Sequence, residues 1–358
     1  MRIAQIAPLW ERVPPPAYGG IELVVGLLTD ELVRRGHEVT LFASGDSLSL
    51  AQLISVHPRA LRLDSTIKDY SIYELMQLAA VFEKADDFDI IHSHMGHATL
   101  GYINLVKTPI VHTLHGIFTS DNEKIFTYAN KQPYISISDA QRQPNLGLNY
   151  VATVYNGIDV NSYDFYPQPT EPLYLAFLGR MSPEKGPHLA IEIAKKSGWR
   201  LKMAGKVDVV DKEFFEKEIQ PHIDGEQIQY LGEANHAQKN ALMGGAVATL
   251  FPITWREPFG LVMAESMATG TPVIAMRLGS TEEVISHGET GFLCTDIQEC
   301  IHAIYKVRRL NRYACRRYVE NNFSVEQMTD GYEAVYQQVM AERFSQNGRF
   351  YRMTSLGK

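Results

Sequence analysis

The chain has 358 residues, of which 45 % are hydrophobic and 21 % are charged, and its formal net charge is −7. A chain of this length exceeds one ordinary hydrophobic core and predicts two domains, while the composition is that of an ordinary soluble protein. The negative charge lies mostly in the first half and argues against nucleic acid as the main partner. Three cysteines without a paired metal-binding spacing, a start that predicts a strand, and the lack of any run of about 18 apolar residues predict a cytoplasmic protein.

Apolar runs and helical periodicity alternate along the first part of the chain. Buried strands are expected at residues 2–7, 38–43, 89–92, 109–115, 134–138 and 151–155, and helices at 20–35 and 73–82. The order of strand, glycine-containing loop, helix and strand is typical of a doubly wound parallel sheet. A proline-rich stretch at 161–172 predicts a linker.

The same alternation begins again after this linker. Strands are expected at 173–178, 200–204, 228–231, 247–251 and 272–276 and after the turn at 287–292, and helices at 187–196, 236–244 and 259–268. A basic helix at 306–317 is expected to present a solvated face, and contact with an anionic membrane surface is the less favoured alternative. Ser324 begins a final helix with a capping box.

The first glycine-containing loop holds Gly19 and Gly20 but lacks the spaced glycines of a dinucleotide-binding fingerprint. A dinucleotide-dependent enzyme is therefore disfavoured. Two interpretations of the paired glycines stay open: they let a ligand approach the backbone closely, or they serve only the geometry of a tight turn.

Three histidines, His92, His94 and His97, lie near the carboxyl end of a predicted strand, where ligands of open parallel sheets collect. A zinc site is disfavoured because no cysteine or further carboxylate completes a ligand set. The acidic stretch 87–89 precedes the strand and is interpreted as a solvated connection, not as a metal site.

The most informative stretch runs from residue 246 to 276 and predicts a strand, a loop, a helix and a second strand. Glu257 lies in the loop, and Glu265 lies about two turns into the helix. The first helical turn, 258–261, presents backbone N–H groups and the positive end of a helix dipole. Such donors, flanked by two carboxylates, suit a phosphorylated sugar, whereas a glutamate taken alone is more often simply solvated.

A pair of cations, Arg180 and Lys185, lies in one loop at the carboxyl end of the strand at 173–178. A planar guanidinium and a point-charge ammonium that converge at such a position suit a diphosphate. Solvated surface side chains are the alternative for each cation taken alone.

These motifs resemble those of a known family. Glu257, Glu265 and the Pro-Phe-Gly-Leu between them resemble the Glu-x7-Glu signature of retaining GT-B glycosyltransferases of family 4. The Gly-Arg-Met-x-x-x-Lys-Gly loop at 179–186 is similar to the diphosphate clamp of that family, and Asn-Gly-Ile-Asp at 156–159 is similar to its turn out of the first domain. Residues 279–283 occupy the place of its Gly-Gly-x-Pro-Glu loop, with serine and glutamate replacing the second glycine and the proline.

The resemblance implies an α/β fold of the GT-B type, in which two Rossmann-like doubly wound parallel-sheet domains face a central cleft. We expect an acceptor-side domain at 1–165 and a nucleotide-sugar-binding domain at 166–334. A C-terminal helix, at about 335–358, is expected to cross back onto the first domain.

The resemblance also implies roles for individual residues. The expected catalytic residues are His94, Glu257, Arg180 and Lys185. The expected donor-binding residues are Gly19, Gly20, His115, Arg180, Lys185, Tyr230, Leu231, Glu257, Phe259, Gly260, Leu261, Val262 and Glu265. No metal ion and no cofactor is expected.

The implied activity is retaining transfer of a hexose from a nucleoside-diphosphate sugar to a saccharide or small-molecule acceptor, as in polysaccharide biosynthesis. UDP-glucose is the first expectation for the sugar donor and GDP-mannose the second, because of their frequency in the family. The acidic first half favours a soluble acceptor over a lipid in an anionic membrane. A nucleotide-sugar epimerase, a phosphorylase and a non-catalytic sugar-nucleotide-binding protein stay open as alternatives.

Overall fold

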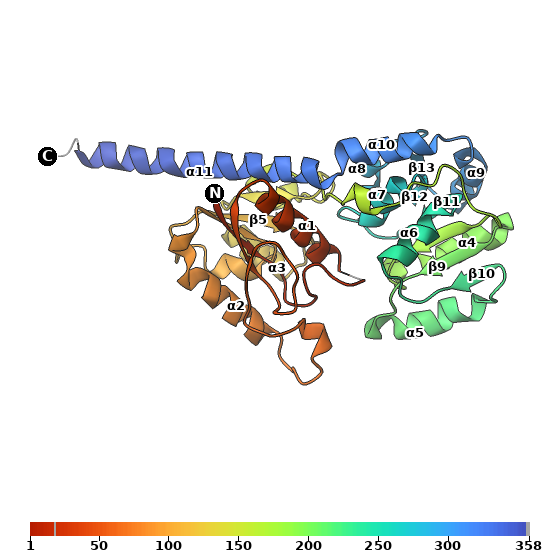
Figure 1. The fold of residues 1–358 in the computed structure, drawn as a ribbon, viewed down its shortest axis with the longest axis horizontal. Coiled ribbons are helices and arrows are strands. Elements are labelled where there is room, and N and C mark those ends of the chain that lie inside the picture. Colours follow the sequence, from red (N-terminus) through yellow and green to blue (C-terminus); the bar gives the residue numbers. More distant parts are fainter. Residues whose placement is uncertain (18, 356–358) are drawn as a thin grey trace.

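Two parallel sheets, each covered by helices, make up the fold, and the first lies in the red-to-yellow part of the chain (Figure 1). The computed structural model describes residues 1–17 and 19–355, and side chains as far as residue 343. The strands of the first sheet are β1 (Arg2–Ile6), β2 (Glu38–Phe42), β3 (Gln52–Ile54), β4 (Ile90–Ser93), β5 (Ile110–Leu114), β6 (Tyr134–Ser136) and β7 (Tyr150–Thr153). Its helices are α1 (Gly20–Arg34), α2 (Ser71–Glu83) and α3 (Asn122–Tyr128).

The second sheet lies in the green-to-blue part of the chain. Its strands are β8 (Leu175–Leu178), β9 (Leu201–Ala204), β10 (Ile228–Tyr230), β11 (Ala248–Phe251), β12 (Val273–Met276) and β13 (Gly291–Cys294). The remaining helices are α4 (Pro187–Ser197), α5 (Lys212–Phe214), α6 (His236–Gly244), α7 (Leu261–Ala268), α8 (Thr281–Val284), α9 (Ile297–Val307), α10 (Arg312–Asn322) and α11 (Val325–Ser355).

The strand order places a topological switch point in each sheet. The order is β3-β2-β1-β4-β5-β6-β7 in the first sheet and β10-β9-β8-β11-β12-β13 in the second, and the paired strands are parallel. The chain therefore reverses its direction of winding between β1 and β4, and again between β8 and β11. Ligands of such sheets bind beyond the carboxyl ends of the strands at these points. The expected GT-B architecture is thus confirmed.

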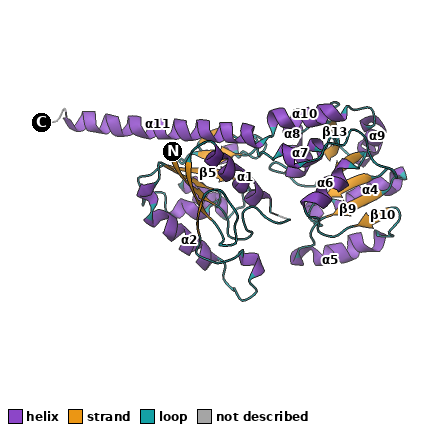
Figure 2. Ribbon diagram, viewed as in Figure 1, coloured by secondary structure: helices purple, strands orange, loops and turns teal. Residues whose placement is uncertain are grey.

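Each sheet has a hydrophobic core on both faces, as expected of a parallel sheet between two helical layers (Figure 2). Successive side chains of a strand point to opposite faces. Ile3 packs with Leu28 of α1, whereas its neighbour Ala4 packs with Leu78 of α2. The second sheet is covered by α6, α7 and α10 on one face and by α4 and α9 on the other.

The long helix α11 returns the chain to the first domain, as predicted (Figure 1). Its apolar residues Val325, Met328, Tyr332, Val335, Tyr336 and Val339 join the core cluster that contains Ile3 and Val24. Steps of three or four residues, with Val335 and Tyr336 side by side, place them on one face of the helix. The contact of α11 with the first domain thus begins at Val325, earlier than the predicted residue 335. Residues 356–358 of the predicted helix lie outside the described residues.

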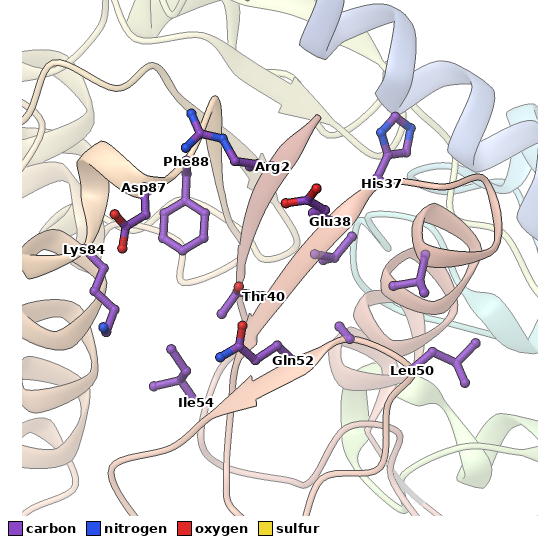
Figure 3. Close-up of a pocket in the computed structure, with 13 residues that line it drawn as sticks. Arg2, His37, Glu38, Thr40, Leu50, Gln52, Ile54, Lys84, Asp87 and Phe88 are labelled. Carbon is purple, nitrogen blue, oxygen red and sulfur yellow. The ribbon is translucent and has the colours of Figure 1, made fainter.

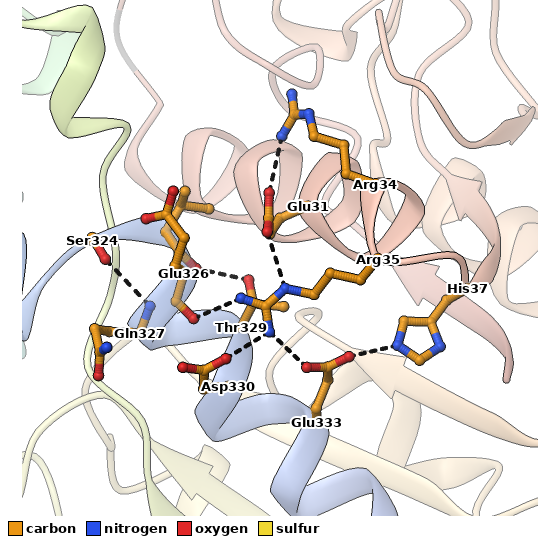
Figure 4. A network of polar contacts seen from close by, with 11 residues as sticks. Glu31, Arg34, Arg35, His37, Ser324, Glu326, Gln327, Thr329, Asp330 and Glu333 are labelled. Atoms are coloured by element: carbon orange, nitrogen blue, oxygen red, sulfur yellow. Dashed lines mark hydrogen bonds and ion pairs between the residues drawn. The ribbon is translucent and has the colours of Figure 1, made fainter.

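Charged side chains hold α11 beside α1 (Figure 4). Arg35 donates hydrogen bonds to Asp330 and Glu333, each at 2.6 Å, and to the backbone oxygen of Glu326 at 3.1 Å. Nε2 of His37 lies 2.6 Å from a carboxylate oxygen of Glu333. The contact between the end of the chain and the first domain is therefore both apolar and ionic.

The basic segment 306–317 differs from its prediction. It is divided between α9 and α10, and Arg312 is only 7 % exposed. The guanidinium of Arg312 donates to three backbone oxygens at 2.7–2.9 Å, and burial lowers its pKa to about 10. The predicted solvated face is wrong at Arg312, because these hydrogen bonds replace the water that a buried guanidinium loses.

Most predicted strands and helices agree closely with the structure. The elements that the sequence did not predict include β3, α3, α8, α9 and a helical segment at 209–222. β3 has three residues and no continuous apolar run, so its place at the sheet edge comes from pairing with β2.

Candidate active site

A cavity of about 320 Å³ lies between the two domains at their switch points. The first domain contributes Gly20, Ile21, His115, Ile137 and Asn156, and the second contributes Leu178, Gly179, Arg180, Lys185, Phe251, Trp255 and residues 257–262. A narrower cavity of about 130 Å³ shares Gly20, Leu178, Gly179, Leu261 and Val262 with it and adds Gly19, Lys206, Glu233, Ala234, Lys239 and Glu265. Most of the residues that the sequence singled out therefore line two adjoining cavities.

Glu257 is held by a cation and an indole. Its Oε2 accepts from Nζ of Lys185 in a short ion pair and from Nε1 of Trp255 at 3.0 Å. The same Lys185 ammonium lies 4.8 Å from the ring centre of Trp255. Although Glu257 is only 7 % exposed, no hydrogen bond from the described residues reaches its Oε1. One oxygen thus fixes the side chain and the other stays available to a ligand hydroxyl.

Glu265, which lines the narrower cavity, is likewise held through one carboxylate oxygen by two donors. Its Oε1 accepts from the hydroxyl of Tyr163 at 2.9 Å and from Nζ of Lys239 at 3.0 Å, and the residue is 3 % exposed. Burial and the nearby carboxylate raise the pKa of Tyr163 well above its usual range, so its hydroxyl is a donor at neutral pH. A carboxylate held through one oxygen suits a pair of vicinal hydroxyls at the other.

Arg180 lines the larger cavity and also lies close to three carboxylates. It forms a short ion pair with Glu184 and lies 3.4 Å from Asp211 and 3.9 Å from Asp208. Burial opposes the charge of Glu184, but its own backbone N–H and Arg180 outweigh this effect and lower its pKa. A diphosphate at Arg180 would share the guanidinium with these acids.

Glycines lie at the starts of α1 and α7, the two helices that meet at the cavity. Gly260 precedes α7 at a φ of +78°, and a Cβ there would lie 2.9 Å from Phe251. Gly19 has a φ of +143°, which explains its place in the tight turn before α1. A Cβ on Gly20 would lie 3.4 Å from Leu261, so the starts of α1 and α7 face each other across the cavity.

The structure places the two predicted histidines differently. His115 lines the cavity, whereas His94 is 2 % exposed and lies behind it. Nδ1 of His94 is 2.8 Å from Nε2 of His115, and its Nε2 is 3.0 Å from Oε1 of Gln5. Both ring nitrogens of His94 are therefore occupied by protein groups, and contact of His94 with a sugar stays a prediction.

Tyr230 and Leu231 are not among the described residues that line the two cavities. The hydroxyl of Tyr230 donates to the backbone oxygen of Gly205 at 2.7 Å, and the cavity wall nearby is formed by Glu233 and Ala234. The donor-binding role of Tyr230 and Leu231 stays a prediction.

Several site residues were missed from the sequence. Trp255 lies two positions before Glu257, but Tyr163 and Lys239 come from the linker and from α6, and no local pattern marks them. Asn156 lines the cavity, is 5 % exposed, and its Oδ1 has no hydrogen-bond partner among the described residues. A buried oxygen without a partner is a candidate acceptor for a ligand hydroxyl.

The acidic stretch 87–89 lies elsewhere, beside a cavity of about 470 Å³ near the amino-terminal ends of β1 and β2 (Figure 3). Asp89 of this stretch pairs with Arg2 at 2.7 Å. No cluster of three or more His, Cys, Asp or Glu side chains within the described part of the chain is arranged to hold a metal ion.

Two family models match consecutive parts of the chain. The model described as Glycosyltransferase Family 4 matches residues 18–162, and the model described as Glycosyl transferases group 1 matches residues 163–324. The chain belongs to the GT-B glycosyltransferases of the family 4 type. The division between the two models, at residue 162, falls in the predicted linker of this family 4 glycosyltransferase.

Curated relatives carry related names. An uncharacterized glycosyltransferase of Methanocaldococcus jannaschii is 26 % identical over 90 % of this chain and 92 % of its own. A phosphatidyl-myo-inositol mannosyltransferase of Mycobacterium leprae is 28 % identical over 82 % of this chain and 83 % of its own. An N-acetyl-alpha-D-glucosaminyl L-malate synthase of Bacillus anthracis is 25 % identical over 93 % of this chain and 97 % of its own.

Solved structures share the fold at low identity. Sucrose-phosphate synthase of Thermosynechococcus elongatus superposes with a TM-score of 0.78 at 18 % identity, over 95 % of this chain and 99 % of its own. HepE of Anabaena in complex with UDP-glucose superposes with a TM-score of 0.70 at 20 % identity, over 97 % of this chain and 100 % of its own. None of the helices in the described residues of this glycosyltransferase is long and apolar enough to cross a membrane.

Proposed function

We propose that this glycosyltransferase moves a hexose from a nucleoside-diphosphate sugar to a saccharide or small-molecule acceptor, with retention of the anomeric configuration and without a divalent metal. UDP-glucose is the first candidate donor and GDP-mannose the second. The observation that carries the proposal is the convergence of Arg180, Lys185, Glu257 and Glu265 on two adjoining interdomain cavities.

The chemistry of these groups suits each part of a sugar nucleotide. Glu265 would accept hydrogen bonds from ribose hydroxyls in the narrower cavity, and Glu257 would accept them from the hexose. Arg180, Lys185 and the backbone N–H groups at the start of α7 would stabilise negative charge on the departing diphosphate. The positive charge that develops on the hexose would be favoured by the Glu257 carboxylate.

In the proposed reaction, the acceptor hydroxyl oxygen forms a bond to the anomeric carbon on the face from which the diphosphate departs. The bond between that carbon and the phosphate oxygen breaks, and the hydroxyl proton passes to the departing phosphate oxygen. Among the described residues that line the larger cavity, Glu257 supplies the one carboxylate, so we favour this same-face attack over double displacement.

The proposed donors rest on the relatives. The UDP-glucose complex of HepE supports a uridine nucleotide, and the mannosyltransferase name of a relative keeps GDP-mannose as the second candidate. The names of the relatives differ in their acceptors, so the acceptor is proposed only as a class.

Thermal unfolding in the presence of UDP, GDP and ADP tests the nucleotide, because a ligand of the native state raises the melting temperature. Nucleotide release from UDP-glucose and GDP-mannose, with and without EDTA, then tests donor and metal dependence. The anomeric configuration of the product, read by NMR, tests retention. Arg180→Ala and Glu257→Ala should each reduce transfer by at least about 100-fold, whereas Lys196→Ala, which removes an exposed cation paired with Glu192, should not.

The alternatives give different results in the same assay. A non-catalytic binding protein would show a thermal shift but no nucleotide release. An epimerase would convert the nucleotide sugar to its isomer without an acceptor. A phosphorylase would consume a saccharide and inorganic phosphate and form a sugar 1-phosphate, without a nucleotide. Near-native transfer by folded Arg180→Ala and Glu257→Ala variants would overturn the proposed site.

A further inference from the structure

A chain of buried hydrogen bonds leads from the interdomain cavity to the C-terminal helix. His115 Nε2 lies 2.8 Å from His94 Nδ1, and His94 Nε2 lies 3.0 Å from Gln5 Oε1. The amide nitrogen of Gln5 then lies 3.1 Å from the hydroxyl of Tyr336 in α11. The first domain thus connects a residue of the cavity wall to a helix that contributes nothing to the cavity lining among the described residues.

The chain continues from Tyr336 through the sheet to a second tyrosine of α11. The hydroxyl of Tyr336 lies 2.6 Å from His92 Nδ1, and His92 Nε2 lies 2.7 Å from Thr113 Oγ1. Thr113 Oγ1 in turn donates to the hydroxyl of Tyr332 at 3.2 Å. Apart from half-buried His115, its members are at most 2 % exposed, so water does not compete for these bonds.

The three histidines of this hydrogen-bond chain are neutral at physiological pH. Burial lowers the pKa of His92 and of His94 well below the usual range, and it lowers the pKa of His115 to about 4. Each neutral ring has one N–H donor and one nitrogen acceptor, so each must donate in one direction and accept in the other.

This requirement determines the direction of every bond. Because Thr113 gives its hydrogen to Tyr332, its oxygen must accept the N–H of His92 Nε2. Nδ1 of His92 is then an acceptor and receives the hydroxyl hydrogen of Tyr336.

The direction continues to the cavity. The oxygen of Tyr336 accepts from the amide NH₂ of Gln5, and the amide oxygen of Gln5 accepts the N–H of His94 Nε2. Nδ1 of His94 can then only accept, so the proton between the two rings is carried by Nε2 of His115.

We propose that Tyr336, Gln5 and Thr113 are positioning residues that hold His115 in the Nε2–H tautomer, so that its Nδ1 offers a lone pair to a hydroxyl of the bound sugar. No hydrogen bond from the described residues reaches Nδ1 of His115, and its ring lines the cavity together with Lys185 and Glu257. The assignment of a sugar to this cavity rests on the proposed function, whereas the tautomer does not.

The tautomer can be observed directly in the ligand-free protein. Two-bond ¹H–¹⁵N correlation spectra of protein labelled with ¹⁵N-histidine distinguish a protonated from an unprotonated ring nitrogen, and His115→Gln and His94→Gln variants assign the signals. We expect a single Nε2–H tautomer for His115 and for His94. An Nδ1–H tautomer or a mixture at His115 in the wild-type protein would overturn the proposal.

Tyr336→Phe should remove this selection, because Gln5 loses its acceptor and the chain can run in either direction. The His115 signals should move toward the values of a tautomer mixture, and kcat/KM for the sugar nucleotide should fall about fivefold, the size expected for one lost orienting hydrogen bond. Thr113→Val is a nearly isosteric change at the far end of the hydrogen-bond chain and should also shift His115 toward a tautomer mixture. It tests the same point if Tyr336→Phe folds poorly. Retention of the single tautomer in a folded variant would show that the chain does not set it.

Tyr134→Phe is the matched control. It removes a buried hydroxyl from the neighbouring strand β6, where it donates to the backbone oxygen of Ala129 at 3.1 Å outside the chain. Its stability should fall as that of Tyr336→Phe does, with the His115 tautomer unchanged. If the expected tautomers are found but no sugar nucleotide is turned over, the proposed function fails and the hydrogen-bond chain stands.

Discussion

Lys185 and Glu257 form a partly buried ion pair that joins two loops 72 residues apart in the chain. Lys185 belongs to the predicted diphosphate clamp, and Glu257 is the first glutamate of the Glu-x7-Glu signature. Their contact therefore places these two motifs side by side. The indole N–H of Trp255 donates to the same carboxylate oxygen of Glu257 that binds Lys185.

This pair predicts a coupled effect on stability. Lys185→Ala leaves a buried carboxylate without its cation, so the free energy of unfolding should fall by about 2 kcal/mol. Glu257→Gln in the same chain should restore part of the loss, since the amide carries no charge. Urea unfolding of the two single variants and the double variant measures the coupling, and strictly additive effects would contradict it.

Glu265 predicts discrimination between ribose and deoxyribose. Glu265→Gln should weaken binding of the nucleotide that gives the largest thermal shift by about tenfold, because a charged acceptor is lost. Binding of its 2′-deoxy analogue should change much less. Calorimetric titration measures both, and Glu192→Gln, at a partly exposed position outside the cavities, is the control. An equal loss of affinity for the two nucleotides would show that Glu265 does not bind the 2′-hydroxyl of the ribose.

Glu283 predicts a link between domain contact and substrate binding. From α8 it accepts the backbone N–H groups of Asp139 at 2.7 Å and Ala140 at 2.8 Å, both in the first domain. Glu283→Ala should therefore increase the radius of gyration in small-angle X-ray scattering and raise KM about threefold to tenfold.

The neighbouring Glu282→Ala variant is the control for Glu283. Glu282 is exposed and its short ion pair is with Arg277 of its own domain. If both variants changed the scattering equally, the contact of Glu283 with the first domain would have no special role.

Glu333 predicts a pH-dependent stability. Burial alone would raise its pKa, but hydrogen bonds from His37 and Arg35 outweigh burial and lower it below its usual range. A carboxyl with a lowered folded-state pKa stabilises the protein above its unfolded-state pKa, and this contribution is lost as the pH falls through the folded-state value. Glu333→Gln should lower the free energy of unfolding by about 1 kcal/mol at pH 7, and the difference should shrink below about pH 4.

Urea unfolding across this pH range checks the Glu333 prediction. Glu326→Gln, an exposed residue of the same helix, is its control (Figure 4). A Glu333→Gln difference that persisted undiminished into acid would show that the carboxylate charge is not its cause.

The two-domain α/β architecture and the main residues of the cavity could be predicted from the sequence alone. Strand and helix periodicity is local, and the Glu-x7-Glu and Arg-x4-Lys spacings lie within single loop-and-helix units that parallel sheets place at the carboxyl ends of their strands. The predicted residues Arg180, Lys185, Glu257 and Glu265 needed no long-range contact to be recognised.

The groups that hold these residues in place could not be predicted from the sequence. Tyr163 and Lys239 reach Glu265 from other elements, and His94 lies behind His115 because its two ring nitrogens bind Gln5 and His115. Such contacts join positions far apart in the chain, and no spacing in the sequence encodes them. The packing of two domains and a returning helix sets them, since that packing decides which polar groups are buried together and must satisfy one another.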